Sequence, residues 1–324
     1  MDSASPLSEL PTVADVASAA TRIAPYVLRT PILRADELDA YAGCVLLFKC
    51  ENLQRGGAFK LRGAMNAVWS LSDAEAAHGV ATHSSGNHGA ALARAARARG
   101  IPCHVVVPVG AVASKLRNIE EQGAVLHRCA PTLAAREAAL VKVLASTGAT
   151  PIHPYDDARV IAGQGTAARE LLEEQPLLDV IIAPIGGGGL IGGTALVARA
   201  HPHPLRVIAA EPAGADDAAR SFRAGQRFTD GPRETIADGL RGSLGVRNFA
   251  LLHAYVDMVW TVDEAAIIAA TRLLWERLRV IVEPSSAVPL AALLQHRDQI
   301  AGLRVGVILS GGNVDLDDLP WVRK

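Results

Sequence analysis

Hydrophobic residues in the N-terminal part of the chain follow two different spacings. Over residues 12–23 they recur every three or four positions, which predicts a short amphipathic helix. A continuous apolar run over residues 45–48 predicts a buried strand, and the pattern over residues 59–71 predicts a second helix. The chain therefore begins with helix and strand segments that alternate.

The alternation continues through the middle of the chain. The pattern predicts strands separated by helices at residues 80–82, 88–99, 104–107, 113–122 and 124–127. Strands that are separated by helices form parallel sheets, because a parallel connection must cross back over the sheet. We expect residues 78–157 to form a small domain.

A second alternating series follows this block. Helices and strands take turns at residues 164–174, 180–184, 191–200, 207–210, 263–278 and 305–309. We expect a large domain that combines residues 1–77 with residues 158–324. The predicted fold class is α/β, with two domains and parallel-rich sheets covered by helices.

Composition and charge narrow the range of partners. Of the 324 residues, 50% are hydrophobic and 20% are charged, and the formal net charge is −1, so neither nucleic acid nor an anionic membrane is expected as a partner. Residues 180–198 carry no charge, but Pro184 and several glycines interrupt them, which favours a strand, a turn and a helix over a membrane span. The N-terminal segment has no basic stretch ahead of an apolar one, so we expect no signal peptide and a cytoplasmic protein with a small-molecule partner.

One lysine and three glycine-containing turns hold the residues best suited to chemistry. Lys60 lies in the glycine-rich run 56–63, and turns at residues 84–89, 186–189 and 310–313 each follow an apolar run. A strand that ends in glycines presents free backbone N–H groups, which bind anions such as phosphate. A lysine becomes a nucleophile only if its surroundings lower its pKa from about 10.4, and a carbonyl cofactor would suit such an amine.

The glycines also fit a competing interpretation. Gly187, Gly189 and Gly192 match the G-x-G-x-x-G pattern of dinucleotide-binding folds, and Glu211 follows at the distance of a ribose-binding acid. A nicotinamide-dependent oxidoreductase would, however, leave Lys60 and the other two turns without a function. We therefore keep this interpretation as the more distant alternative.

Lys60 and the three turns together resemble the pyridoxal-phosphate enzymes of the tryptophan-synthase-β fold type (fold type II). The nearest likeness is to the group of serine racemase, threonine dehydratase and threo-3-hydroxyaspartate dehydratase. The resemblance implies that Lys60 forms the Schiff base with the cofactor and removes the substrate α-proton, while Ser85 acts as a second catalytic group on the opposite ring face. It also implies a cofactor site made of Phe59, Lys60, Asn87, Gly186, Gly187, Gly188, Gly189, Gly239, Glu283 and Ser310.

The resemblance further implies a substrate site and a cation site. The substrate set is Ser84, Ser85, Asn87, His88 and Arg136, with Arg136 or Arg241 near a far carboxylate of the substrate. His88 could instead only cap or pack, and Arg136 could be an exposed helix residue. Glu211, Asp217 and the carbonyl of Ala215 resemble a site for Mg²⁺, or for Ca²⁺ or Mn²⁺, although a solvated acidic loop is the simpler interpretation of these residues.

These expectations converge on a lyase that acts on amino acids. We expect β-elimination of water from threo-3-hydroxyaspartate, serine or threonine, which yields a keto acid and ammonia or an imine. Racemisation of serine or aspartate is the alternative main activity, and a vitamin-B6-binding protein without turnover is a further one. The resemblance also suggests a homodimer. Two departures leave the substrate open, because Gly56-Gly57-Ala58 replaces hydroxyl-bearing residues of the family and Tyr155 replaces an asparagine of mammalian racemases.

Overall fold

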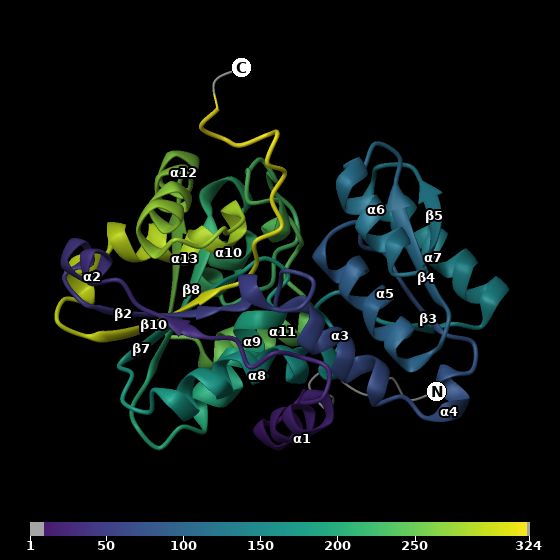
Figure 1. Cartoon of the computed structure of the whole chain (residues 1–324), viewed down its shortest axis with the longest axis horizontal. Helices are drawn as coiled ribbons and strands as arrows, with labels where there is room; N and C mark the ends of the chain where they lie inside the picture. The colour runs from purple at the N-terminus through teal and green to yellow at the C-terminus, as the bar shows by residue number, and fades with distance from the viewer. Residues whose placement is uncertain (1–9, 323–324) are drawn as a thin grey trace.

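The computed structural model describes residues 10–322, so the N-terminal segment in which no signal peptide was expected lies largely outside the described residues. Two separate sheets organise the chain (Figure 1). The larger sheet has six strands in the order β1-β2-β10-β7-β8-β9, and the smaller sheet has four in the order β5-β4-β3-β6. The predicted α/β class with parallel-rich sheets is confirmed.

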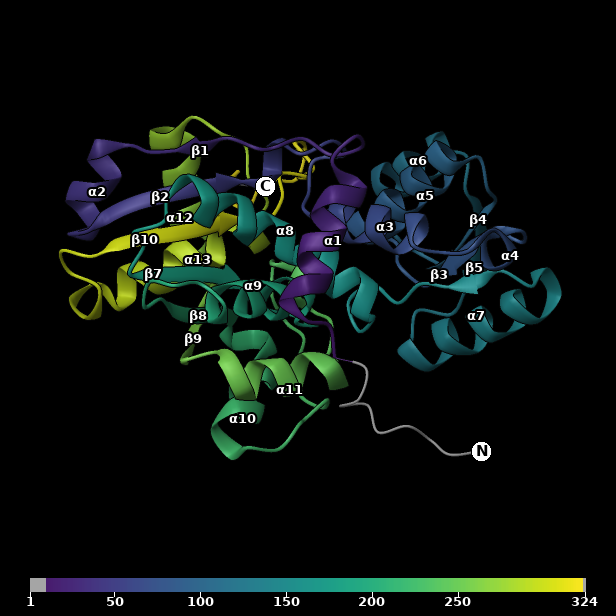
Figure 2. The same cartoon turned by 90° about the horizontal axis from the view of Figure 1, so that it is seen from below.

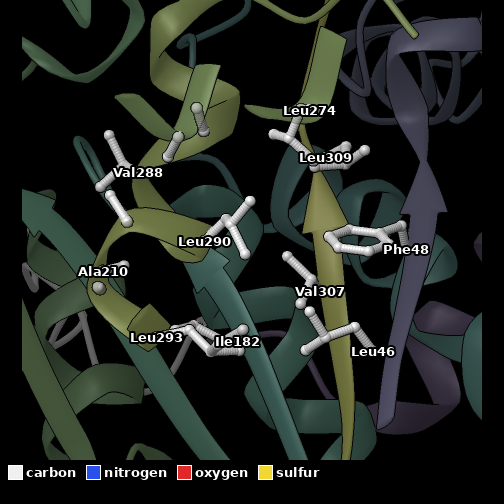
Figure 3. Close-up of a cluster of buried hydrophobic side chains, with 14 of the residues drawn as sticks. Leu46, Phe48, Ile182, Ala210, Leu274, Val288, Leu290, Leu293, Val307 and Leu309 are labelled. Atoms are coloured by element: carbon white, nitrogen blue, oxygen red, sulfur yellow. The ribbon is translucent and has the colours of Figure 1, made fainter. Parts of the chain in front are cut away.

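The larger sheet is parallel except for its first strand. Its strands are β1 (Ile32–Leu33), β2 (Val45–Cys50), β7 (Val180–Pro184), β8 (Arg206–Pro212), β9 (Met258–Val262) and β10 (Arg304–Leu309). Only β1 pairs antiparallel, and β10 and β7 lie in the centre of the sheet (Figure 2). The core on one face joins Phe48 and Val307 to Leu290 of α13 (Pro284–Gln295), as Figure 3 shows. The parallel strands therefore point their carboxyl ends, and the turns after them, toward one edge.

The smaller sheet is entirely parallel and consists of residues between 80 and 151. Its strands are β3 (Val80–Thr82), β4 (Cys103–Pro108), β5 (Val125–Cys129) and β6 (Thr150–Pro151). It carries α5 (Asn87–Arg99), α6 (Ala113–Glu121) and α7 (Leu133–Thr147), on the right of Figure 1. Helix α3 (Lys60–Trp69) packs against both α5 and α8 (Ala158–Glu174) and so joins the two halves of the molecule.

Most predicted elements are present, with shifts that have physical causes. Helix α1 (Val13–Ile23) begins after Thr12, whose side chain forms a capping box with Asp15. Helix α8 starts at residue 158, six residues before the predicted residue 164. Gly163 and Gly165 lie inside the helix, at the points where α8 crosses neighbouring helices. A Cβ atom on Gly163 would lie 2.6 Å from Gly63 of α3, and one on Gly165 would lie 2.8 Å from the Gly193 carbonyl of α9 (Gly189–Arg199).

Other elements were missed or differ in type. The single helix expected over residues 263–278 is instead α12 (Glu264–Leu273) followed by a π-helical turn, Leu274–Leu278. The missed elements are α2 (Asp36–Ala42), α4 (Asp73–Ala76), α7, α10 (Asp217–Ala224), α11 (Val246–Tyr255), α13, β1, β6 and β9. Helix α13 is buried on nearly all sides and contains Pro289, so it lacks the amphipathic spacing that reveals a surface helix. Among the described residues, no helix combines the length and the hydropathy that crossing a membrane requires.

Candidate active site

A cavity of about 670 Å³ lies between the two halves of the molecule. Its wall contains every residue of the predicted cofactor and substrate sites, namely Phe59, Lys60, Ser84, Ser85, Asn87, His88, Arg136, Gly186, Gly187, Gly188, Gly189, Gly239, Glu283 and Ser310. The predicted cation residues Glu211, Ala215 and Asp217 are not among the lining residues. The structure thus gathers segments far apart in the sequence around one cavity.

Lys60 is the first residue of α3, and buried charges anchor this helix. Two residues further on, the fully buried Arg62 donates to Glu51 at 2.7 Å and to Glu170 at 2.7 Å. This network joins the segment after β2 to α8. It fixes the start of α3, and therefore the direction of the Lys60 side chain.

The Lys60 amine lies in a buried, weakly charged environment. Its Nζ donates to the Pro154 carbonyl at 2.9 Å and lies 5.1 Å from the Phe59 ring centroid and 5.9 Å from that of Tyr155. Burial lowers the pKa of Lys60 to about 8, although the Glu283 carboxylate acts in the opposite direction. A sizeable fraction of the amine is therefore neutral near pH 7.5, as a nucleophile or base requires.

The four glycines at residues 186–189, which run from the turn after β7 into the first residue of α9, form an open backbone cradle. Gly188 has a φ of 93°, which a side chain would disfavour, and a Cβ atom there would lie 2.6 Å from Asn248. A Cβ atom on Gly186 would lie 2.8 Å from the Leu240 backbone, and one on Gly187 would overlap the Tyr155 ring. The turn leads into the N-terminus of α9. It fits a phosphate group, since that helix end attracts anions.

The third turn lies directly beside the lysine segment. The Phe59 N–H donates to the Ser310 carbonyl at 3.0 Å, and Ala58 forms an isolated β-bridge with Gly311. Ser310 is 3% exposed and lines the cavity. These contacts hold the lysine and the end of β10 in register.

Glu283 connects the third turn to the start of α5. Its two carboxylate oxygens accept hydrogen bonds from Asn87 Nδ2 at 3.0 and 3.1 Å, and one also accepts from the Asn313 N–H at 3.2 Å. Burial raises the pKa of Glu283 to about 7. Gly239 approaches from the same side, and its N–H donates to Ser285 Oγ at 3.0 Å.

The remaining predicted substrate residues differ in how they are held. Ser84 and Ser85 are half-buried in the turn after β3, and His88 is buried at 2% exposure, where burial and the Lys60 charge lower its pKa well below the usual range. The Arg241 guanidinium donates to the Thr235 carbonyl at 3.0 Å, so it is already bound. The guanidinium of Arg136, in the first turn of α7, has no ion pair or hydrogen bond to the residues that the structure describes.

The predicted cation residues Glu211, at the end of β8, and Asp217, at the start of α10, accept hydrogen bonds from backbone N–H groups. Glu211 accepts hydrogen bonds from the N–H groups of Ala218 at 3.0 Å and Ala219 at 2.7 Å, and Asp217 accepts one from Leu244 at 2.8 Å. Burial raises the pKa of both carboxyls, and the charge of Asp217 raises that of Glu211 further. No cluster of three or more His, Cys, Asp or Glu side chains suited to a metal occurs in residues 10–322. Glu211 is not among the residues that line the cavity at the glycine turn, and its two oxygens are bound to backbone N–H groups, which does not match the ribose-binding acid of the dinucleotide interpretation.

Sequence reasoning missed several residues of the cavity wall. His83, Lys115, Arg233 and Asp238 line the cavity, and Lys115 of α6 forms an ion pair with Asp238. His83 directly precedes the serine turn, which was the only signal for it. Lys115 and Arg233 lie in segments without a glycine-turn pattern, so only the tertiary fold shows that they face the cavity. Asp238 directly precedes the predicted Gly239, which was the local signal for it.

Comparisons with known proteins agree with this geometry. The chain is 51% identical to the beta-hydroxyaspartate dehydratase of Paracoccus denitrificans (strain Pd 1222) over 312 residues, covering 96% of this chain and 99% of that protein. It is 49% identical to the serine racemase of Arabidopsis thaliana over 315 residues, covering 95% and 94%. The solved structure of maize serine racemase superimposes with a TM-score of 0.93 at 46% identity, covering 95% of each chain. Residues 23–311 match the family described as pyridoxal-phosphate dependent enzyme, and the chain belongs to that family.

Proposed function

We propose that the protein is a dehydratase that eliminates water from a β-hydroxy-α-amino acid, with threo-3-hydroxyaspartate as the preferred substrate and serine or threonine as lesser ones. The products are a keto acid and ammonia, or an imine. The observation that carries this choice is the unpaired Arg136 in the cavity wall. The relative named beta-hydroxyaspartate dehydratase supports it.

The chain's own residues suit the cofactor of the family. Gly186–Gly189 would hold the phosphate, Phe59 and Gly239 would lie on the two ring faces, and Ser310 would share a hydrogen bond with the pyridine nitrogen. Asn87, oriented by Glu283, would reach the phenolic oxygen. When bound, the cofactor supplies an electron sink for the charge that develops at the substrate Cα.

Lys60 and the serine turn at residues 84–89 would bind the substrate and move its protons. Ser84, Asn87 and His88 would bind the α-carboxylate at the start of α5, where backbone N–H groups favour an anion. Neutral Lys60 would take the α-proton, and the ammonium formed would then donate a proton to the departing hydroxyl, which leaves as water. Ser85 carries a hydroxyl that could donate a proton from the other side, which supports racemisation of serine or aspartate as a second activity, as do the relatives named serine racemase.

Charge in the cavity favours a doubly anionic substrate. Among the described lining residues, basic groups outnumber acidic ones. The basic groups are Lys60, Lys115, Arg136, Arg233 and Arg241, and the acidic groups are Asp238 and Glu283. A bound phosphate would compensate part of this excess, and a substrate with two carboxylates would compensate more than serine would. Arg136 is the free guanidinium, and it would form a bidentate contact with the far carboxylate.

A divalent cation and a second subunit complete the proposal. Mg²⁺, Ca²⁺ or Mn²⁺ would bind Glu211, Asp217 and the Ala215 carbonyl. Burial raises the pKa of Glu211 and the Asp217 charge raises it further, and a bound cation would stabilise both carboxylates in their charged form. A homodimer would bury the exposed apolar side chains of Leu28, Leu53 and Ile281. Hydrogen bonds from Gln54 to the Leu28 backbone and from Asn52 to the Ile281 carbonyl connect the three segments that carry these side chains.

A substrate panel tests the proposed function. The purified protein should bind pyridoxal phosphate with a visible absorption band, and borohydride should fix the cofactor to Lys60. Ammonia release is then measured with threo-3-hydroxyaspartate, serine and threonine, with Mg²⁺ and with a chelator. Tight nicotinamide binding without pyridoxal phosphate binding would refute the proposal, and cofactor binding without turnover or racemisation of any amino acid would favour a non-catalytic protein.

A further inference from the structure

His83 occupies a position in the cavity wall that the proposed function has not yet used. It follows β3, directly before the serine turn, and is 9% exposed. Its Nδ1 is buried and has no hydrogen-bond partner on any other described residue, and the polar backbone group that acts on the ring is its own. A buried polar atom without a partner is costly, so such an atom beside a cavity commonly marks a ligand contact.

Arg136 presents the same property beside it. Its Nε is buried and lacks a partner within residues 10–322, and its charge lowers the pKa of His83 in addition to the larger effect of burial. The other titratable groups that face His83 are His153, His88 and Glu137. Two side chains that each have a buried nitrogen without a partner therefore line the same cavity, near enough for the Arg136 charge to act on His83.

The neighbouring histidines do not satisfy His83. The His153 ring meets it edge-on at a centroid distance of 5.6 Å, and His153 Nδ1 already accepts the Asp156 N–H at 2.9 Å. His88 is buried, and the backbone group that acts on its pKa belongs to Ile152 and not to His83. Glu137 is exposed. The group best suited to both His83 and Arg136 is an anion that enters from the cavity.

We propose that His83 and Arg136 together bind the far carboxylate of a dicarboxylic substrate, so that His83 determines specificity for hydroxyaspartate over serine. This inference rests on the proposed function, because it assigns a second contact to the same substrate. A carboxylate accepts up to four hydrogen bonds, so the guanidinium and the imidazole can bind it at once. Serine has no group that reaches this subsite.

The test compares two substrates in variants of the holoenzyme. His83→Asn and His83→Gln should lower kcat/KM for threo-3-hydroxyaspartate by about 10-fold or more, mainly through KM, because a hydrogen bond to a charged group is lost. The same variants should keep kcat/KM for serine within about 3-fold, with an unchanged cofactor spectrum and Tm. His253→Asn, an exposed histidine outside the cavity, is the matched control and should change neither.

Equal loss with both substrates, or no loss with either, would overturn the inference and leave His83 as a packing residue. Calorimetric titration with succinate, an unreactive four-carbon dicarboxylate, measures binding to the subsite without turnover. This measurement tests the subsite separately from the proposed function. If the wild-type enzyme does not turn over hydroxyaspartate, yet His83→Gln weakens succinate binding by about 10-fold, the subsite stands and the proposed function fails. If hydroxyaspartate is turned over equally by all variants, the proposed function stands and the subsite fails.

Discussion

Asn87 and Glu283 join the two halves of the protein through a paired contact, in which one side-chain amide donates to both carboxylate oxygens at 3.0 and 3.1 Å. Asn87 begins α5 beside the smaller sheet, and Glu283 precedes α13 on the larger sheet. A second amide, that of Asn313, donates to Asn87 Oδ1 at 2.9 Å and orients it. The predicted cofactor residues therefore support one another before any ligand is considered.

Lys60→Ala should abolish covalent attachment of the cofactor and lower the elimination rate by about 1000-fold or more, because the general base is removed. Lys60→Arg is the matched charged variant and should be equally inactive, since a guanidinium does not lose its proton near neutral pH. Mass spectrometry after borohydride treatment, together with ammonia release, measures both effects. Covalent labelling of either variant at another lysine, with activity retained, would contradict the assignment.

The rate at which the lysine condenses with the cofactor should depend on pH. Because burial lowers the pKa of Lys60 to about 8, its neutral fraction rises from about 1% at pH 6 to about one half at pH 8, and it levels off above about pH 9. Stopped-flow absorbance after mixing apoprotein with pyridoxal phosphate measures this rate. A rate that keeps rising through pH 10 would mean that the amine is solvated.

Glu283 should make the stability of the cofactor-free protein depend on pH. Its folded pKa of about 7 exceeds the ordinary value of 4.5, so the folded state binds the proton more tightly than the unfolded state does. Its favourable contribution is complete below pH 4.5 and is lost as pH rises to about 7, at a cost of about 3 kcal/mol. Denaturant unfolding should show that Glu283→Gln removes this loss. Parallel curves for the two proteins from pH 5 to pH 8 would contradict it.

Gly187→Ala should weaken cofactor binding at least about 10-fold, because the new methyl overlaps the Tyr155 ring and displaces it. The double variant Gly187→Ala with Tyr155→Ala removes the clash and should recover part of the affinity, as a coupled pair does. Equilibrium titration of the cofactor absorption band measures both. An unchanged dissociation constant in the single variant would show that the phosphate does not use this turn.

The sequence revealed the parts of the site where local structure carries the signal. Lys60 and the four glycines at residues 186–189 stand out because a glycine turn after an apolar run is a local pattern. Helix α13 and strand β9 did not stand out, because their environments are set by long-range packing. His83, similarly, did not stand out, because the Arg136 charge that acts on it comes from α7, about fifty residues further along the chain. The proposed domain boundaries near residues 77 and 157 rest on the same local alternation and on the separate smaller sheet.

The ion pair between Lys115 and Asp238 offers a test in which two substitutions act in opposite directions. The Lys115 charge lowers the pKa of Glu283, and the Asp238 charge raises it. Lys115→Met should therefore raise the pKa of Glu283, so that the pH-dependent loss of stability occurs at higher pH. Asp238→Asn should lower the pKa of Glu283, so that the loss occurs at lower pH. The partly exposed pair contributes only about 0.2–1 kcal/mol by itself, so both variants should stay folded. Shifts of the same sign in the pH dependence of denaturant unfolding would show that neither charge acts on Glu283.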